Sequence, residues 1–94
     1  MARLSDSEID ERLAGSGWRR EGGALVRDFE LTGFNAAMAL ANAVADAANK
    51  ANHHPDILVH DYKHLRLTLS THSAGGITEN DFSLAAMIDG LAPA

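Results

Sequence analysis

The strongest restriction on the fold comes from an alanine-rich segment, residues 34–52, that is directly followed by His53-His54-Pro55. Nine of its residues are alanine, the best helix former, so this segment is predicted to be a long helix. Proline disfavours helical geometry at the residue before it, so the helix is expected to end at or just before the two histidines. One apolar stripe is expected from residues three and four apart: Phe34, Met38, Ala41, Ala45 and Ala48.

Two pairs of extended segments flank this helix. The first pair is joined by a Glu21-Gly22-Gly23 turn of the hairpin type. The last segment is the most regular, because leucines at alternate positions give it one apolar face. The four segments predicted as strands are 18–20, 24–31, 57–62 and 65–71.

Capping patterns predict a helix at each end of the chain. Ser5 with Glu8 marks the start of the first, and Thr78 with Asp81 marks the start of the last. The predicted order is therefore α-β-β-α-β-β-α in a single domain, residues 1–94. Two hairpins separated by a helix indicate an α+β fold, a four-stranded antiparallel sheet with three helices packed on one face.

Composition excludes several classes of function. The net charge of −5 does not suit binding to nucleic acid, and the absence of cysteine excludes disulfides and thiolate chemistry. The first residues lack the apolar run of a signal peptide, and segment 34–52 carries too many polar residues to span a membrane. We therefore expect a cytoplasmic protein. A chain of 94 residues builds only a small core, so we also expect a homo-oligomer.

Histidine is the unusual residue type. All five histidines lie within twenty consecutive positions: His53, His54, His60, His64 and His72. Imidazole is the side chain that changes charge nearest neutral pH, which suits acid–base chemistry.

The histidines also fall into a longer pattern. Pro55 is followed by six residues and Tyr62, then by nine residues and His72, then by eight residues and Asp81. With the surrounding segments 52–56, 67–72 and 75–82, this pattern closely resembles the pterin-4a-carbinolamine dehydratase family. The resemblance extends over about the whole chain.

This resemblance implies an enzyme that dehydrates 4a-hydroxytetrahydropterin to quinonoid dihydropterin, as in tetrahydrobiopterin recycling. It implies neither a metal nor a further cofactor, because the pterin is the substrate. His53 and His72 are the implied general acid and base, His54 contacts the substrate, and Asp81 orients a histidine. The family also implies a dimer or, more specifically, a homotetramer.

Further positions are expected to bind the pterin. They are Trp18, Asn49, Pro55, Asp56, Thr71 and Ser73. Asn49 departs from the family, which usually has glutamate or another ionisable residue there. If the family's glutamate orients a histidine or touches the substrate, we expect that contact to be weakened here or replaced by an amide hydrogen bond.

Each of these residues has a simpler structural interpretation. His53 and His54 would cap the last carbonyls of a helix, and Asp81 would only complete a capping box. Trp18 would belong to the core, as would Phe29, Phe34 and Phe82.

Two other functions remain open from the sequence. His60 and His64 are expected to be solvated surface residues, although five histidines also permit a weak metal-site hypothesis. The alternative to an enzyme is an interaction module, a dimerisation cofactor of a transcriptional regulator, which would use an apolar helix face.

Overall fold

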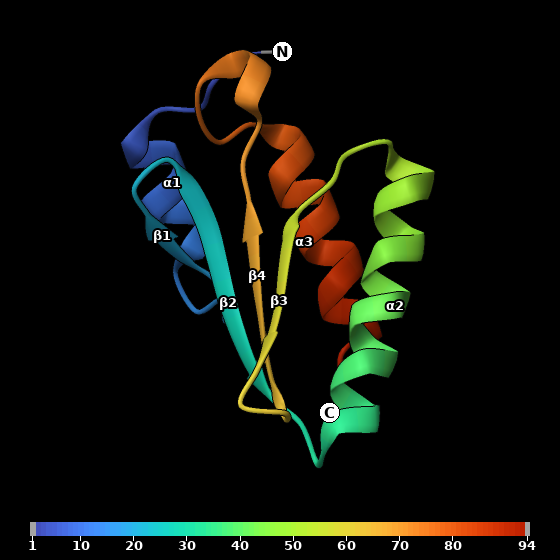
Figure 1. Cartoon of the computed structure of the whole chain (residues 1–94). Helices are drawn as coiled ribbons and strands as arrows, with labels where there is room; N and C mark the ends of the chain where they lie inside the picture. Colours follow the sequence, from blue (N-terminus) through green and yellow to red (C-terminus); the bar gives the residue numbers. More distant parts are fainter. Residues whose placement is uncertain (1, 94) are drawn as a thin grey trace.

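The computed structural model, which describes residues 2–93, has the predicted order of elements (Figure 1). The helices and strands, in chain order, are α1 (Asp6–Leu13), β1 (Arg19–Glu21), β2 (Ala24–Glu30), α2 (Phe34–Ala51), β3 (Asp56–His60), β4 (His64–Leu69) and α3 (Glu79–Leu91), with a short 3₁₀ turn, η1 (His72–Ala74), before α3.

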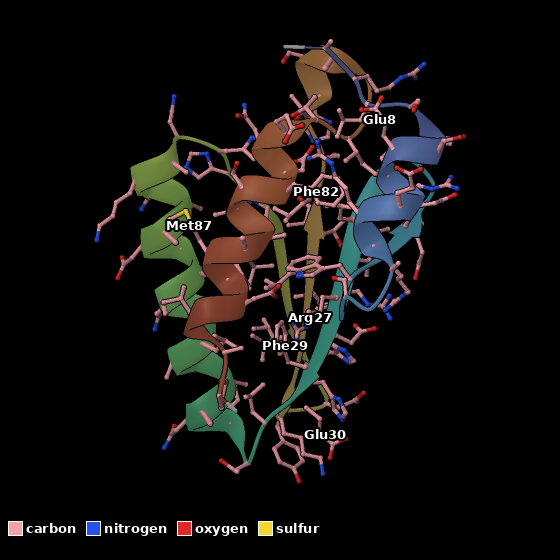
Figure 2. The ribbon with its side chains drawn as sticks, turned by 180° about the vertical axis from the view of Figure 1, so that it is seen from behind. Glu8, Arg27, Phe29, Glu30, Phe82 and Met87 are labelled. Atoms are coloured by element: carbon pink, nitrogen blue, oxygen red, sulfur yellow. The ribbon has the colours of Figure 1, made fainter. Side chains whose placement is uncertain are left out.

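The four strands form one antiparallel sheet in the order β1-β2-β4-β3. All three helices lie on the same face of it (Figures 1 and 2). The alternating leucines of β4, Leu65, Leu67 and Leu69, are fully buried in the core beneath the helices. The predicted α+β fold is therefore confirmed. No helix within residues 2–93 combines the length and apolar character needed to cross a bilayer.

The predicted apolar stripe of α2 is wrong in part. Phe34 is 54% exposed and Met38 is 37% exposed, so neither belongs to the core. The face that packs on the sheet and α3 is formed instead by Ala37, Leu40, Ala41, Val44, Ala47 and Ala48. In a helix so rich in alanine, more than one face is apolar enough to be buried, so periodicity alone does not select between them.

The third predicted strand also ends early, at His60 rather than Tyr62. Asp61 and Tyr62 have φ values of 46° and 51°, which are left-handed values within the three-residue turn, 61–63, that joins His60 to its partner His64. Tyr62 therefore lies in the β3–β4 turn and is largely exposed.

Arg27 is a charged residue on the otherwise apolar face of β2, and its side chain stays on that face. Its guanidinium lies 4.4 Å from the centre of the Phe29 ring and forms an ion pair with Asp89 of α3. Figure 2 shows Arg27 and Phe29 side by side on the side of the sheet that the helices cover. The charge is thus accommodated by a helix partner and an aromatic face.

The opposite face carries a charge cluster centred on Asp28. Its carboxylate accepts hydrogen bonds from Arg66 Nε at 2.7 Å and Arg19 at 2.9 Å. These hydrogen bonds, that of Arg66 first, lower the pKa of Asp28 below its usual 3.8. A carboxyl with a lowered pKa stabilises the folded chain above its unfolded pKa, and this contribution disappears as the pH falls through the folded pKa.

We therefore expect Asp28→Asn to lower the free energy of unfolding at neutral pH by at most about 1 kcal/mol. The effect is small because the three side chains are 40–44% exposed. Urea unfolding at several pH values checks this, and the difference from wild type should close below about pH 4. A difference that stays constant down to acid pH would contradict the assignment.

Candidate active site

Most of the predicted site residues, with Trp18 as an exception, lie at one end of the sheet. The C-terminal ends of α2 and β4, the η1 turn and the start of α3 all lie there, at the top of Figure 1. The β3–β4 turn, with His60 and His64 beside it, lies at the opposite end.

His53 is placed by the end of α2. Asn52 caps the helix with a left-handed φ of 51°, and the His53 N–H donates back to the Ala48 carbonyl at 3.1 Å. The imidazole then points to α3, where its Nε2 lies 2.6 Å from Asp81 Oδ1. The side chain of His53 is only 15% exposed and that of Asp81 is fully buried. The ring therefore bonds a side chain rather than the last helix carbonyls.

Asp81 combines two structural roles. As the third residue of α3, it accepts the Thr78 N–H at 2.8 Å through Oδ2, which completes the predicted capping box. The same Oδ2 accepts the hydroxyl of Thr71 at 2.9 Å, and Oδ1 faces His53. Capping and contact with a histidine therefore coexist in one carboxylate.

This arrangement determines which nitrogen of His53 is available. A carboxylate oxygen only accepts hydrogen bonds, so the proton in the contact belongs to Nε2 of His53. Nδ1 is then the nitrogen that is free to give or take a proton.

His54 makes a separate contact with Asn49, the residue that departs from the family pattern. Its Nε2 lies 3.1 Å from Oδ1 of Asn49, one turn back on α2, and both residues are exposed. The amide of Asn49 therefore makes a hydrogen bond to a histidine of the predicted site.

His72 and Ser73 begin the η1 turn and are exposed. They directly follow Thr71, whose hydroxyl bonds Asp81, so the chain brings them to the same end as His53. Pro55 is half-buried and Asp56, the first residue of β3, is exposed.

Thr71 differs from the other expected substrate contacts. It is 8% exposed, and its hydroxyl is engaged with Asp81 and Thr78. Its N–H donates to the Gly76 carbonyl, and its own carbonyl accepts from Ala74 and Gly76. With its polar atoms bonded within the protein, Thr71 supports Asp81 rather than facing a ligand.

Trp18 belongs to the core, which is the structural interpretation given for it from the sequence. It is 4% exposed, and its indole N–H donates to Asp89 Oδ1 at 2.8 Å. A cavity of about 170 Å³ beside it is lined by α1, the following loop and α3. The expectation that Trp18 contacts the pterin has no support in this placement, because the ring is buried and its N–H is bonded to Asp89.

His60 and His64 face each other across β3 and β4, with ring centres 5.3 Å apart. Both are half-buried, and His60 Nδ1 lies 3.1 Å from the Asp61 carboxylate. Within residues 2–93, no three histidine or acidic side chains are grouped as a metal site requires.

The sequence did not identify Thr78 as part of the site. Its hydroxyl lies 2.8 Å from that of Thr71, behind Asp81, and the residue is fully buried. The capping box marked Thr78 as a structural residue, but only the fold brings its hydroxyl next to Thr71.

Comparison with known proteins gives a consistent result. The family model described as pterin 4 alpha carbinolamine dehydratase matches residues 2–91. A Chloroflexus aurantiacus protein is 51% identical over 95% of this chain and 96% of its own length. A Thermomicrobium roseum protein is 48% identical over 98% and 99%. Both are provisionally named pterin-4-alpha-carbinolamine dehydratase.

Solved structures also match. A Brucella melitensis protein described as a transcriptional coactivator/pterin dehydratase superposes with a TM-score of 0.89, 33% identity and coverage of 97% of this chain and 99% of that one. A pterin dehydratase-like protein identified as a RuBisCO assembly factor in the alpha-carboxysome superposes with a TM-score of 0.68 and 25% identity, over 83% of this chain and 92% of that one.

Proposed function

Because the chain belongs to the pterin 4 alpha carbinolamine dehydratase family, we propose that it converts 4a-hydroxytetrahydropterin to quinonoid dihydropterin and water. This reaction is one step in the recycling of a tetrahydropterin cofactor after an aromatic hydroxylation. The chain would act in the cytoplasm, since its lack of cysteine suits a reducing compartment. As the family implies, the active assembly would be a homotetramer.

The chemistry needs two proton transfers. The hydroxyl on C4a leaves as water only if it is protonated, and a proton on a ring nitrogen departs as the new double bond forms. One proton is thus given and one taken, with no change in redox state. A general acid and a general base near neutral pH meet this need, and each contributes about 10²–10⁴-fold.

His53 is the first of these groups in our proposal. The observation that carries it is the 2.6 Å contact between its Nε2 and the fully buried Asp81, which leaves Nδ1 for the substrate. His72, exposed on the neighbouring η1 turn, is the second. Asp81 acts through His53 and is therefore a positioning residue.

The pterin would bind over His54, Pro55, Asp56 and Ser73, which lie at the same end of the sheet. His54 is oriented by Asn49, so a fixed imidazole edge faces the polar pterin ring.

We expect Asn49→Leu to raise the KM for the pterin about threefold to tenfold, because one neutral hydrogen bond that orients His54 is lost. The turnover number should change little, since binding alone is affected. Asn42→Leu, at another exposed asparagine of α2, is the matched control and should leave KM unchanged. Equal KM values for Asn49→Leu and wild type would remove Asn49 from the site.

The activity itself is tested by generating the 4a-hydroxytetrahydropterin in situ and following the quinonoid product by ultraviolet absorbance. The proposal predicts that the purified chain accelerates product formation well above the spontaneous rate, and that a chelator does not abolish the acceleration. A rate equal to the spontaneous one would overturn it, and a loss of activity in chelator would favour a metal site.

A second candidate function is binding to another protein. A groove of about 540 Å³ between α2 and α3 is lined by apolar and charged side chains, including Met87 and Leu91, both more than 40% exposed. Figure 2 shows Met87 between the two helices. The Brucella melitensis neighbour is described as a coactivator as well as a dehydratase. Turnover by the chain without any partner separates the enzyme from a pure interaction module.

A further inference from the structure

Two buried threonine hydroxyls lie behind Asp81. We propose that Thr78 and Thr71 form a one-way hydrogen-bond relay that positions Asp81 and thereby keeps the proton of neutral His53 on Nε2. Thr71 and Thr78 are then positioning residues, and their catalytic effect rests on the proposed dehydratase function.

The relay is continuous and buried. Thr78 is fully buried and Thr71 is 8% exposed. The two hydroxyl oxygens are 2.8 Å apart, and that of Thr71 is 2.9 Å from Asp81 Oδ2. No described buried side-chain polar atom lacks a partner within residues 2–93, so the network is complete.

Counting protons gives the relay its direction. A carboxylate has no proton to give, so the single hydroxyl proton of Thr71 is donated to Asp81. Thr71 must therefore accept in its contact with Thr78, and the Thr78 hydroxyl donates. The Thr78 oxygen accepts in turn from the N–H of Asn80 at 3.2 Å.

The cap of α3 does not require this direction. A capping hydroxyl needs only to accept from the helix N–H groups, so its own proton is free to point anywhere. In Thr78 that proton is directed inward to Thr71, away from the cap. The start of α3 is thus linked through Thr71 to the end of β4, and both elements hold the same carboxylate.

The link orients Asp81 from both sides. Oδ2 is held by the Thr71 hydroxyl and the Thr78 N–H, which leaves Oδ1 directed at His53. A weaker hold on Oδ2 would let the carboxylate rotate and allow His53 to carry its proton on Nδ1 instead. In that tautomer the Nδ1 atom that faces the substrate already carries a proton and is unable to accept one.

The test compares two helix caps in the full-length chain. Thr78→Ala loses both the cap and the relay donor, whereas Thr78→Ser retains both. Ser5→Ala loses the equivalent capping box of α1 and touches no relay, so it is the matched control. Thr71→Val removes the donor to Asp81 without changing a cap.

We expect Thr78→Ala and Thr71→Val to lower the turnover number about tenfold with little change in KM, and Thr78→Ser to restore it. Ser5→Ala removes an exposed cap, so it should lower the melting temperature less than Thr78→Ala does, and it should leave turnover at the wild-type level. Turnover lost equally in Ser5→Ala would mean that only stability is involved, which would overturn the proposal.

Nitrogen NMR of the imidazoles provides a readout that does not depend on turnover. In the wild-type chain, neutral His53 should carry its proton on Nε2, and the Thr71 and Thr78 hydroxyl protons should exchange slowly. Thr71→Val should raise the fraction of the Nδ1–H tautomer. An unchanged tautomer in folded Thr71→Val and Thr78→Ala would overturn the relay, whether or not the chain proves to be a dehydratase.

Discussion

The His53→Ala variant should turn over 4a-hydroxytetrahydropterin about 10²- to 10⁴-fold more slowly than the wild-type chain. The substitution removes the Nδ1 atom that we propose as acid or base, while Asp81, buried behind it, has no proton to offer in its place. The measurement is the rate of quinonoid product formation at saturating pterin. His72→Ala is expected to slow the same step, because the reaction needs a second proton-transfer group.

His60→Ala is the matched control for this substitution. His60 is also a partly buried histidine bonded to an acidic side chain, but it lies at the opposite end of the sheet. It should retain the wild-type rate. Equal rates for His53→Ala, His72→Ala and wild type would refute the assignment of catalytic residues.

Asp81→Asn should lower turnover nearly as much as His53→Ala does, by about 10²–10⁴-fold. The amide retains the size of the carboxylate but loses the charge that stabilises an imidazolium. An amide N–H₂ facing His53 donates to Nε2 and forces the ring proton onto Nδ1, the inverted tautomer. Because Asp81 is fully buried and holds three donors, the free energy of unfolding should also fall, by about 1–3 kcal/mol.

Glu79→Gln separates the two effects of Asp81→Asn. Glu79 lies two residues earlier in the same first turn of α3, and it pairs with Arg12 of α1 at the surface. Glu79→Gln also removes a negative charge from the start of the helix, but Glu79 makes no contact with His53. Activity should stay at the wild-type level in Glu79→Gln. A rate in Asp81→Asn equal to that of Glu79→Gln would mean that Asp81 is only a capping residue.

The fold was largely readable from the sequence because local signals agreed with one another. The Ser5–Glu8 and Thr78–Asp81 capping boxes, the alternation of β4 and the proline after His54 all predicted elements that the structure contains. The errors arose where the local signal was degenerate. An alanine-rich helix does not reveal which of its apolar faces is buried, so Phe34 was misplaced in the core. Tyr62 looked like a strand residue because no glycine marks its left-handed turn.

The site was only partly predictable for a related reason. The spacing of His53, His72 and Asp81 grouped them in one predicted site, but spacing carries no information on which atoms meet. The contact between Thr71 and Thr78 depends on how the end of β4 packs beside the start of α3, which is a tertiary property. Thr71 therefore looked like a substrate contact, and Thr78 looked like a cap alone.

The central claim is that three histidines from two separate segments serve one bound pterin. The most direct measurement is a titration of the chain, labelled with ¹⁵N in its imidazoles, with a stable dihydropterin. The account predicts that the resonances of His53, His54 and His72 shift together with one saturation curve, while those of His60 and His64 stay unchanged. Shifts confined to His60 and His64, or no saturable shift at His53 and His72, would contradict it.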